Sequence, residues 1–370
     1  MRIGVPKEIK TREYRAGLTP ASVAELTRLG HVVLVETEAG IGIGLDDDQY
    51  RAAGAKIVAS ADGVFDGAEL IVKVKEPQLV ECAKLKPHHT LFTYLHLAAD
   101  KPQAEALCGS GCRAIAYETV TAPTGRLPLL QPMSEVAGRM SIQVGARALE
   151  KVAGGPGLLL GGVPGVAPAK VAILGGGVAG ENALQMAIGM RSDVTLFERS
   201  LLRIAELDRE YGAAARIAYS TGAAVREAVL DADLVIGAVL IPGAAAPKLV
   251  TRDMLKEMRP GSVLVDIAID QGGCFETSKP TTHDDPTYEI DGIIHYCVAN
   301  MPGGVPRTST FALNNATLPF VIALAEKGTD RALADDPHLM NGLNIAKGGV
   351  ALKVVAEALS LPYAPYSIAA

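Results

Sequence analysis

Three glycines stand at the spacing of a phosphate-binding turn. Gly175, Gly177 and Gly180 lie in KVAILGGGVAG, directly after a short apolar run. In the G-x-G-x-x-G pattern the first glycine allows a tight turn, the second lets a pyrophosphate approach the backbone, and the third lets a helix pack on a strand. The N–H groups that open such a helix are available to phosphate oxygens. The segment predicts a dinucleotide site; the alternative is a glycine-rich turn of an ordinary α/β protein.

An acidic residue follows at the distance expected for ribose binding. The next apolar run, Val194–Phe197, ends at Glu198, which is 18 residues after Gly180, close to the usual offset of roughly 20 residues. A carboxylate accepts hydrogen bonds from the ribose hydroxyls and repels a 2′-phosphate. NAD is therefore expected rather than NADP, although the neighbouring Arg199 offers a group that can accept a phosphate.

Basic residues at two other strand ends offer binding groups for an anionic substrate. Arg15, in REYRAGLTP, has a planar fork that fits a carboxylate in a way that lysine does not. An isolated arginine is more commonly a solvated surface residue. Lys73 and Lys75 flank Val74 in LIVKVKEP, at a strand end where ligand sites of open α/β sheets lie, and alternation places them on one face. A pair of solvated lysines is an equal alternative, which their spacing does not exclude.

Two further residues are candidates for proton transfer and charge stabilisation. His96, in LFTYLHLA, follows an apolar strand and can exchange a proton near neutral pH. The alternative is a core histidine bonded to a backbone carbonyl. Asp270 ends SVLVDIAID, where a carboxylate would face a ligand cleft. Asp266 competes for that role within the same run, but hydrogen bonding to the nearby backbone is the simpler expectation for it.

Composition favours small-molecule chemistry in a two-domain protein. The chain has 370 residues, 49% of them hydrophobic, and a net charge of −6, so it offers no basic surface for nucleic acid or an anionic membrane. The uncharged stretch 152–169 contains six glycines and three prolines, which indicates a loop rather than a membrane span. The five cysteines include no C-x-x-C pair, so neither a disulfide framework nor a zinc site is expected. MRIGVPKEIK does not resemble a signal peptide, and a cytoplasmic location is expected.

Short apolar runs alternate with helical segments along most of the chain, which predicts mostly parallel sheets. Strands are expected at Arg2–Val5, His31–Glu36, Leu70–Val74, Thr90–Tyr94, Arg113–Ala116, Val171–Leu174, Val194–Phe197, Leu234–Ile236 and Val263–Ile267. Thr19 is expected to cap a helix that has Pro20 in its first turn and that Gly30 ends. Long helices are expected at Ser134–Val152 and Asn314–Lys327.

The predicted fold is α/β, with two Rossmann-like domains of mostly parallel strands and a cleft between them. The connection is expected near residues 125–135, and the helix at Asn314–Lys327 is expected to return to the first domain. The discontinuous substrate-binding domain then comprises residues 1–128 and 307–370. Residues 129–306 form a doubly wound dinucleotide-binding domain.

Several segments together resemble the bacterial alanine dehydrogenase family, which also includes the transhydrogenase alpha subunit. They are YRAGLTP, LIVKVKEP, FTYLHLA, LPLLQPMSEVAGRMSIQVGARALEK, GGVPGVAPAKVAILGGGVAG, VDIAIDQGGCFETSKPTTHDDPTYEIDGIIHYCVANMPG and VPRTSTFALNNATLPF. The resemblance implies reversible NAD-dependent oxidative deamination of L-alanine to pyruvate and ammonia, in a subunit that assembles into a hexamer. It also implies substrate binding by Arg15 and Lys75, and catalysis by His96 and Asp270.

The same resemblance implies a wider set of cofactor contacts. They are Ser134, Val178, Ala179, Arg203, Ser220, Val239, Leu240, Ile267, Asp270, Val298, Ala299, Asn300 and Met301. Ser134 has an alternative role as a helix cap, and Val239 and Leu240 as core residues. Some relatives resemble metal binders near the C-terminal helix, but Ala323 and Lys327 are poor ligands for a hard cation, and no metal is expected.

Two other functions remain as alternatives. One is an enzyme of the same superfamily that acts on a larger amino acid, such as lysine or its glutarate adduct. The other is a nucleotide-binding component like the soluble part of proton-translocating transhydrogenase, which works with membrane partners. The retained Arg15, Lys75, His96 and Asp270 favour the free-standing dehydrogenase.

Overall fold

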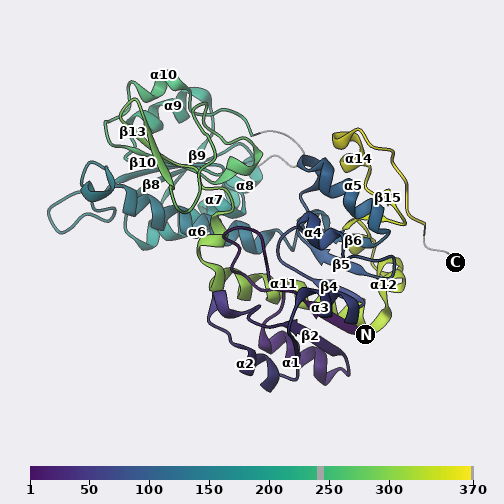
Figure 1. Cartoon of the computed structure of the whole chain (residues 1–370). Coiled ribbons are helices and arrows are strands. Elements are labelled where there is room, and N and C mark those ends of the chain that lie inside the picture. The colour runs from purple at the N-terminus through teal and green to yellow at the C-terminus, as the bar shows by residue number, and fades with distance from the viewer. Residues whose placement is uncertain (240–245, 368–370) are drawn as a thin grey trace. The chain divides into compact units, whose positions relative to one another are not determined.

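The chain divides into two compact units, each built on its own sheet (Figure 1). The computed structural model describes residues 1–239 and 246–367. Unit 1 comprises Met1–Met133 and Val305–Ala370, and unit 2 comprises Ser134–Gly304. Both ends of the chain therefore belong to unit 1.

Unit 2 contains a sheet with the strand order of a dinucleotide-binding fold. Its strands are β7 (Lys170–Leu174), β8 (Asp193–Glu198), β9 (Arg216–Tyr219), β10 (Leu234–Gly237), β11 (Val263–Asp266), β12 (Thr287–Ile290) and β13 (Ile293–Tyr296). They lie in the order β12-β13-β11-β10-β7-β8-β9, and the β12–β13 pair is antiparallel whereas the other pairs are parallel. The strand order reverses between β7 and β10, which is where such sheets bind ligands.

Apolar side chains on both faces of this sheet are buried. The helical segments of unit 2 include α6 (Gln131–Ala148), which begins in unit 1, α7 (Val178–Gly189), α8 (Leu201–Tyr211), α9 (Gly222–Asp231), α10 (Arg252–Leu255), η4 (Lys151–Ala153), η5 (Ile267–Gln271) and η6 (Met301–Gly304). Ala172 and Leu174 pack in one cluster with Val225 and Val229 of α9. The intervening Ile173 is also fully buried. Burial on both faces explains why the parallel strands are continuous apolar runs.

Unit 1 repeats this topology. Its strands are β1 (Arg2–Val5), β2 (Val32–Glu36), β3 (Lys56–Val58), β4 (Leu70–Val72), β5 (Thr90–Thr93), β6 (Arg113–Ala116), β14 (Leu343–Ala346) and β15 (Gly349–Val350). They lie in the order β15-β14-β6-β5-β4-β1-β2-β3, with parallel pairs from β3 to β6 and antiparallel pairs at β14. The order reverses between β1 and β4, and such a reversal is where open α/β sheets bind ligands. The predicted fold of two mostly parallel Rossmann-like sheets is confirmed.

The helical segments of unit 1 come from both ends of the chain. They are α1 (Pro20–Arg28), η1 (Ile41–Ile43), α2 (Asp47–Ala52), α3 (Ala61–Gly67), α4 (Leu79–Cys82), η2 (Leu97–Ala99), α5 (Lys101–Ser110), η3 (Tyr117–Thr119), α11 (Pro306–Lys327), α12 (Thr329–Asp335), α13 (Pro337–Met340) and α14 (Lys353–Leu359). Asn314 of α11 joins the two stretches, because it accepts a hydrogen bond from the Thr19 backbone at 2.8 Å and donates one to the Gly17 carbonyl at 3.1 Å.

The predicted helix signals are largely confirmed, with three corrected boundaries in two long helices. Thr19 caps α1 through a hydrogen bond from Ser22 N, and Gly30 follows the helix at φ +86°. Helix α11 ends at Lys327 as predicted but begins at Pro306, where the fixed φ of proline suits a first turn. Helix α6 begins at Gln131 rather than Ser134 and ends at Ala148 rather than Val152. In the described parts of the chain, we find no helix with the length and apolar character needed to cross a bilayer.

Candidate functional site

The glycine turn of unit 2 has the backbone geometry that its spacing predicts. Gly175 follows β7 with φ +106°, a conformation that L side chains rarely adopt. Gly177 is the N-cap of α7, and a Cβ there would meet no described atom within 4 Å. A Cβ on Gly180 would lie 1.8 Å from the Gly175 carbonyl oxygen, so only glycine lets α7 approach the turn. The opening N–H groups of α7 are thus placed at the point where the strand order of the sheet reverses.

We expect Gly180→Ala to damage this turn, because the new methyl group would overlap a backbone oxygen that no rotamer change can move. The predicted loss is about 1–3 kcal/mol in the stability of unit 2, with weakened NADH binding measured by fluorescence titration. Gly189→Ala is the matched control, since a Cβ there meets nothing within 4 Å in the same helix. That control is expected to be neutral or stabilising. Equal behaviour of the two variants would contradict the packing role of Gly180.

Glu198 holds a fixed negative charge beside the glycine turn. Its Oε2 accepts a hydrogen bond from Gly176 N at 2.8 Å, and its Oε1 accepts from Arg199 N at 2.7 Å and Ser200 N at 2.8 Å. Arg203 supports the same turn by donating from Nε to the Gly176 carbonyl at 2.9 Å. These bonds hold the carboxylate at the carboxyl end of β8, where an adenosine ribose binds in this fold.

The charge of Arg203 is balanced by carboxylates of its own unit. Its guanidinium forms ion pairs with Glu181 of α7 and with Glu206, the latter at 2.9 Å. These ion pairs and the hydrogen bond to Gly176 hold the Arg203 guanidinium at the glycine turn. The side chain of Arg199 is exposed.

In unit 1, Arg15 is buried, so its interpretation as a solvated surface arginine is wrong. Its side chain is 1% exposed and forms a bidentate ion pair with Glu13, whose side chain is equally buried. Nε donates to Glu13 Oε1 at 2.6 Å and Nη2 to Oε2 at 2.5 Å, while Nη1 contacts the Met133 sulfur at 3.1 Å. Burial of a guanidinium requires such partners.

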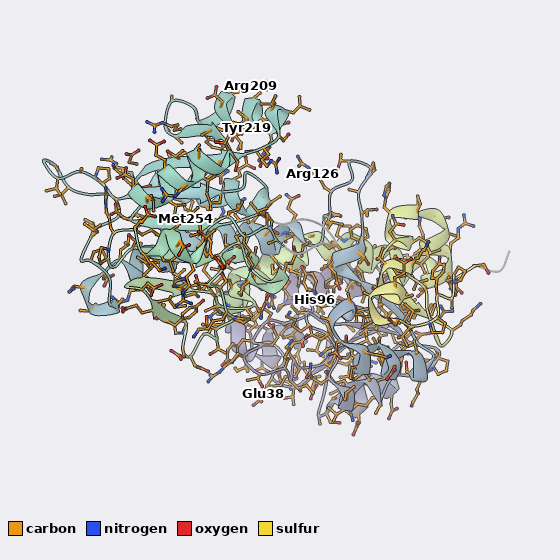
Figure 2. The ribbon with its side chains drawn as sticks, turned by 90° about the horizontal axis from the view of Figure 1, so that it is seen from above. Glu38, His96, Arg126, Arg209, Tyr219 and Met254 are labelled. Atoms are coloured by element: carbon orange, nitrogen blue, oxygen red, sulfur yellow. The ribbon has the colours of Figure 1, made fainter. Side chains whose placement is uncertain are left out.

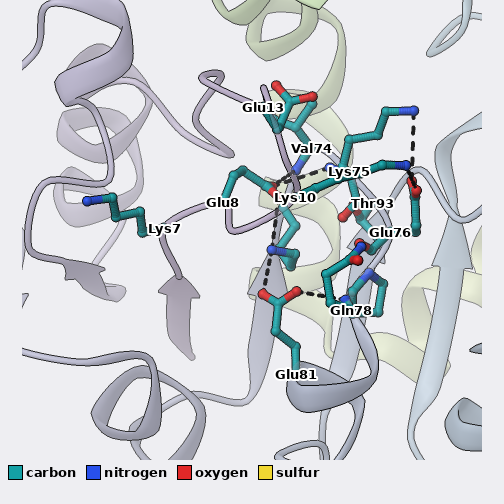
Figure 3. A network of polar contacts seen from close by, with 12 residues as sticks. Lys7, Glu8, Lys10, Glu13, Val74, Lys75, Glu76, Gln78, Glu81 and Thr93 are labelled. Atoms are coloured by element: carbon teal, nitrogen blue, oxygen red, sulfur yellow. Dashed lines mark hydrogen bonds and ion pairs between the residues drawn. The ribbon is translucent and has the colours of Figure 1, made fainter. Parts of the chain in front are cut away.

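The two lysines after β4 have different surroundings. Strand β4 ends at Val72, before both residues. Lys73 is completely buried between Glu8 and Glu81, at 3.0 and 2.7 Å, which rules out the solvated interpretation for it. The Lys75 ammonium lies 3.8 Å from Glu76 and its side chain is 12% exposed. Lys75 is therefore the lysine of this pair that retains access to solvent, and Figure 3 shows the polar network around it.

The loop that carries Lys75 is held by its backbone. Glu8 Oε1 accepts hydrogen bonds from Val74 N at 2.7 Å and Lys75 N at 3.3 Å (Figure 3). The Lys75 carbonyl accepts a bond from the Thr93 hydroxyl at 3.0 Å, at the end of β5. The loop is therefore tied to the segment after β1 on one side and to β5 on the other.

His96 is exposed rather than buried, so its interpretation as a core histidine is wrong. The residue, labelled in Figure 2, adopts φ +51° and ψ +35° just after β5. Its ring stacks on that of Tyr94, with the centroids 5.8 Å apart and the planes at 8°. Glu118 Oε1 accepts hydrogen bonds from His96 N at 2.6 Å and Leu95 N at 3.2 Å. Sparsely populated backbone conformations of this kind concentrate at functional sites.

The same topology brings Arg15, Lys75 and His96 to one edge of the unit 1 sheet. They follow β1, β4 and β5, which are adjacent in the order β5-β4-β1. The carboxyl ends of parallel strands lie at one edge of a sheet, so the loops that carry this guanidinium, ammonium and imidazole leave the sheet at the same edge. Such a set can bind a carboxylate and transfer a proton.

In unit 2, the two aspartates after β11 have separate roles. Asp266 is buried and accepts hydrogen bonds from Ala268 N at 3.1 Å, Cys274 N at 2.8 Å and Ser278 Oγ at 2.5 Å. Burial raises the pKa of its carboxyl, and these bonds partly offset the increase. The expected structural role of Asp266 is therefore confirmed. Asp270 lies in η5 and is exposed.

The other predicted cofactor contacts lie mostly at loops and helix starts of unit 2. Val178 and Ala179 open α7, and Ser220 N, after β9, donates to the Glu198 carbonyl at 2.9 Å. Ser134 lies inside α6, so it does not cap that helix. Val239 and Ile267 are partly exposed, whereas Leu240 lies outside the described residues. Residues 298–301 precede or open η6, and Asn300 adopts φ +58°.

Glu13 and Glu118 did not emerge from the sequence, although both contact predicted site residues. The i, i+2 spacing of Glu13 and Arg15 in the loop after β1 is a weak local signal for the first. Glu118 is 22 residues from His96 along the chain, and no local pattern connects the two. Among the described residues, no cluster of three or more histidine, cysteine, aspartate or glutamate side chains is arranged to hold a metal ion.

The sequence matches two domain families along nearly its whole length. Residues 4–137 match the alanine dehydrogenase/PNT N-terminal domain, and residues 141–353 match the alanine dehydrogenase/PNT C-terminal domain. The chain belongs to the alanine dehydrogenase/PNT family. Its C-terminal match extends past unit 2 into α11–α14, because the chain returns to unit 1 after Gly304.

Individual members of the family are similar over nearly their full lengths. An alanine dehydrogenase of Halomonas elongata is 59% identical over 98% of both chains, and one of Bacillus subtilis is 54% identical over 99% of this chain and 96% of its own. Among solved structures, an L-alanine dehydrogenase matches with a TM-score of 0.95 and 50% identity over 97% of this chain and 99% of its own. A transhydrogenase of Sinorhizobium meliloti matches with a TM-score of 0.82 and 25% identity over 95% and 99%.

Proposed function

We propose that the protein is an NAD-dependent alanine dehydrogenase, which interconverts L-alanine and water with pyruvate and ammonia. The proposal is supported by the position of Arg15, Lys75 and His96 in loops that follow three adjacent strands, in a chain 59% identical to an alanine dehydrogenase. The higher identity to alanine dehydrogenases than to the transhydrogenase favours this function over the transhydrogenase component.

We assign NAD binding to residues 129–306. The residues present fit the group, since Gly177 leaves the start of α7 uncovered and Glu198 holds a carboxylate beside the turn. Glu198 would accept hydrogen bonds from the ribose hydroxyls and disfavour a 2′-phosphate, and Glu181 and Glu206 balance the charge of Arg203 beside the turn. The cofactor contacts inferred from the resemblance, Leu240 and residues 298–301 included, belong to this assignment. NAD, when bound, supplies the acceptor for the hydrogen and electron pair that leave the α-carbon of alanine.

We assign substrate binding to residues 1–128 and 307–370. Arg15 would bind the alanine carboxylate through Nη1, because an anionic oxygen is a much stronger acceptor than the Met133 sulfur that Nη1 now contacts. Lys75, held through its backbone by Glu8 and Thr93, would orient the amine and later the carbonyl oxygen of pyruvate.

Proton transfer is assigned to His96. Once the α-carbon is oxidised to an iminium, neutral His96 removes a proton from the water that adds to it. The resulting imidazolium then returns that proton to the departing nitrogen, and the neutral imidazole takes the hydroxyl proton as ammonia leaves and the carbonyl of pyruvate forms. Asp270 would position the water and stabilise the positive charge of the iminium.

The decisive experiment follows NADH absorbance with the purified protein and a panel of keto acids at saturating ammonium. Oxidation of NADH with pyruvate, but not with keto acids of larger amino acids, is expected. A protein that binds NADH yet leaves it unoxidised with pyruvate and ammonium would refute the proposal.

A parallel series with NADPH tests cofactor choice: comparable kcat/KM for both cofactors would contradict the role of Glu198.

We expect Arg15→Lys to weaken substrate binding more than turnover. The ammonium of lysine is a point charge and does not pair with Glu13 through two nitrogens while presenting a third to the substrate, as the guanidinium would. It would also leave Glu13 with a poorer partner inside the protein. The predicted result is a roughly tenfold or larger rise in the KM for pyruvate, determined by initial-rate kinetics. Unchanged KM and kcat would place the carboxylate elsewhere.

Oligomerisation and location complete the proposal. We propose a homo-oligomer, specifically a hexamer as the resemblance implies, supported by the exposed apolar side chains Val152, Leu159, Val163 and Val166 in the glycine-rich segment of unit 2. A monomer in light-scattering measurements would contradict it.

A cytoplasmic location is supported by the free thiols of all five cysteines, as in a reducing compartment.

A further inference from the structure

Glu13 is a buried carboxylate placed against the guanidinium of Arg15. The side chains of both residues are 1% exposed, so water does not screen the pair. Besides the two side-chain bonds, Glu13 Oε1 accepts a hydrogen bond from the Arg15 backbone at 3.0 Å. Glu13 therefore fixes both the backbone and the side chain of Arg15.

Glu13 keeps its negative charge despite its burial. Burial alone would raise the pKa of this carboxyl, but the hydrogen bonds and charge of Arg15, together with the charge of Lys75, hold the pKa below its usual value. The carboxylate thus interacts with both cations that the proposed function assigns to substrate binding. Figure 3 shows Glu13 on the same side of the network as Val74 and Lys75.

We propose that Glu13 is a specificity-determining residue that restricts the substrate site to molecules with a single carboxylate. This inference rests on the proposed function, because it assumes that Arg15 and Lys75 bind the substrate. Glu13 occupies the Nε–Nη2 edge of the guanidinium, so a substrate carboxylate would bind beside Nη1, which contacts the Met133 sulfur. It also neutralises one of the two positive charges at the site.

The charge of Glu13 acts differently on monoanions and dianions. One substrate carboxylate would contact Arg15 and Lys75 directly, so their attraction outweighs the repulsion from Glu13 and from Glu76, which lies 3.8 Å from Lys75. A second carboxylate on a molecule of similar size adds a further negative charge that repels Glu13 in a site with little screening. Removal of the Glu13 charge should therefore strengthen the binding of a dianion more than that of a monoanion.

Oxamate and oxalate are suitable probes, because both have the size and planar shape of pyruvate. At about pH 8 the first carries one negative charge and the second carries two. The ratio of their two inhibition constants, each measured in competition with pyruvate, does not change when a variant weakens the binding of both anions equally. Thermal shift of the protein with each anion gives the same comparison without turnover.

In the wild-type protein we expect oxamate to bind more tightly than oxalate. Glu13→Gln should shift the ratio of inhibition constants toward oxalate by about tenfold or more, because it removes a buried negative charge beside the bound anion. Glu13→Asp keeps the charge and should keep the ratio, even if both anions bind more weakly. Glu25→Gln is the control for net charge, since Glu25 pairs with Arg28 on the exposed surface of α1, and it should leave the ratio unchanged.

Two results would overturn the inference. One is tighter binding of oxalate than of oxamate to the wild-type protein, a test that does not depend on the folding of any variant. The other is a ratio in Glu13→Gln that stays within twofold of wild type. Failure of the wild-type protein to turn over pyruvate would instead count against the proposed function, and the thermal-shift comparison separates the two failures.

Discussion

Replacement of His96 with asparagine is expected to lower kcat by about 10²–10⁴-fold, the range that positioned acid–base groups contribute. Asparagine tolerates the left-handed backbone conformation at φ +51° better than alanine does, so the loss reports the imidazole rather than local strain. The KM for pyruvate and the affinity for NADH should change little, because neither contact is assigned to His96. Steady-state kinetics give kcat and the KM for pyruvate, and stopped-flow measurements give the affinity for NADH.

The contact between Glu118 and His96 supplies the control for this prediction. Glu118→Ala removes the acceptor of His96 N and Leu95 N, and we expect a smaller loss in kcat, about tenfold, through misplacement of the imidazole. If Glu118 acts only through His96, the double variant should be no slower than His96→Asn alone. Near-normal turnover of His96→Asn, with cofactor binding intact, would refute the catalytic assignment.

Features set by neighbouring residues were the most predictable from the sequence. The cap of α1 at Thr19 and the glycine turn at Gly175–Gly180 depend on residues within a few positions of each other. Strands β1 and β6 match their predicted limits, because each is an apolar run with clear borders. Strand β3 was missed, since it has only three residues at the edge of its sheet and no fully buried side chain.

The polar contacts of the site were far less predictable, because they join distant segments. Lys73 and Glu8 are 65 residues apart, and the sheet order β4-β1 is what brings them together. The histidines show the same limit. His89 bonds to the Phe65 carbonyl in the core whereas His96 is exposed, although both lie next to the same strand. Local sequence does not specify which side of a packed element a polar residue faces.

The buried charges around Lys73 lead to the largest predicted effect on stability. Burial alone would lower the pKa of this ammonium, but the charges of Glu8 and Glu81 raise it to about 12. Burial also raises the pKa of Glu8. Lys73→Met would leave two buried carboxylates without their cation, and loss of one partner of a buried ion pair costs about 3–5 kcal/mol. Chemical denaturation at neutral pH measures this loss.

The stability loss of Lys73→Met should depend on pH with a definite sign. Without the ammonium, the pKa of Glu8 in the folded protein rises further above its value in the unfolded chain, so the folded state binds more protons between the two values. The free energy of unfolding then falls as pH rises through that interval. The deficit relative to wild type should therefore be smaller at about pH 5 than at about pH 8.

Two further variants separate lost charge balance from lost packing. Lys73→Met combined with Glu8→Gln and Glu81→Gln removes all three charges but keeps oxygen acceptors for Val74 N and Gln78 N. It should recover much of the stability, because the unpaired carboxylates are gone. Lys7→Met breaks an exposed pair with Glu38 and should cost no more than about 1 kcal/mol. If Lys73→Met were as mild as Lys7→Met, the buried ions would not be what holds the Lys75 loop to the sheet.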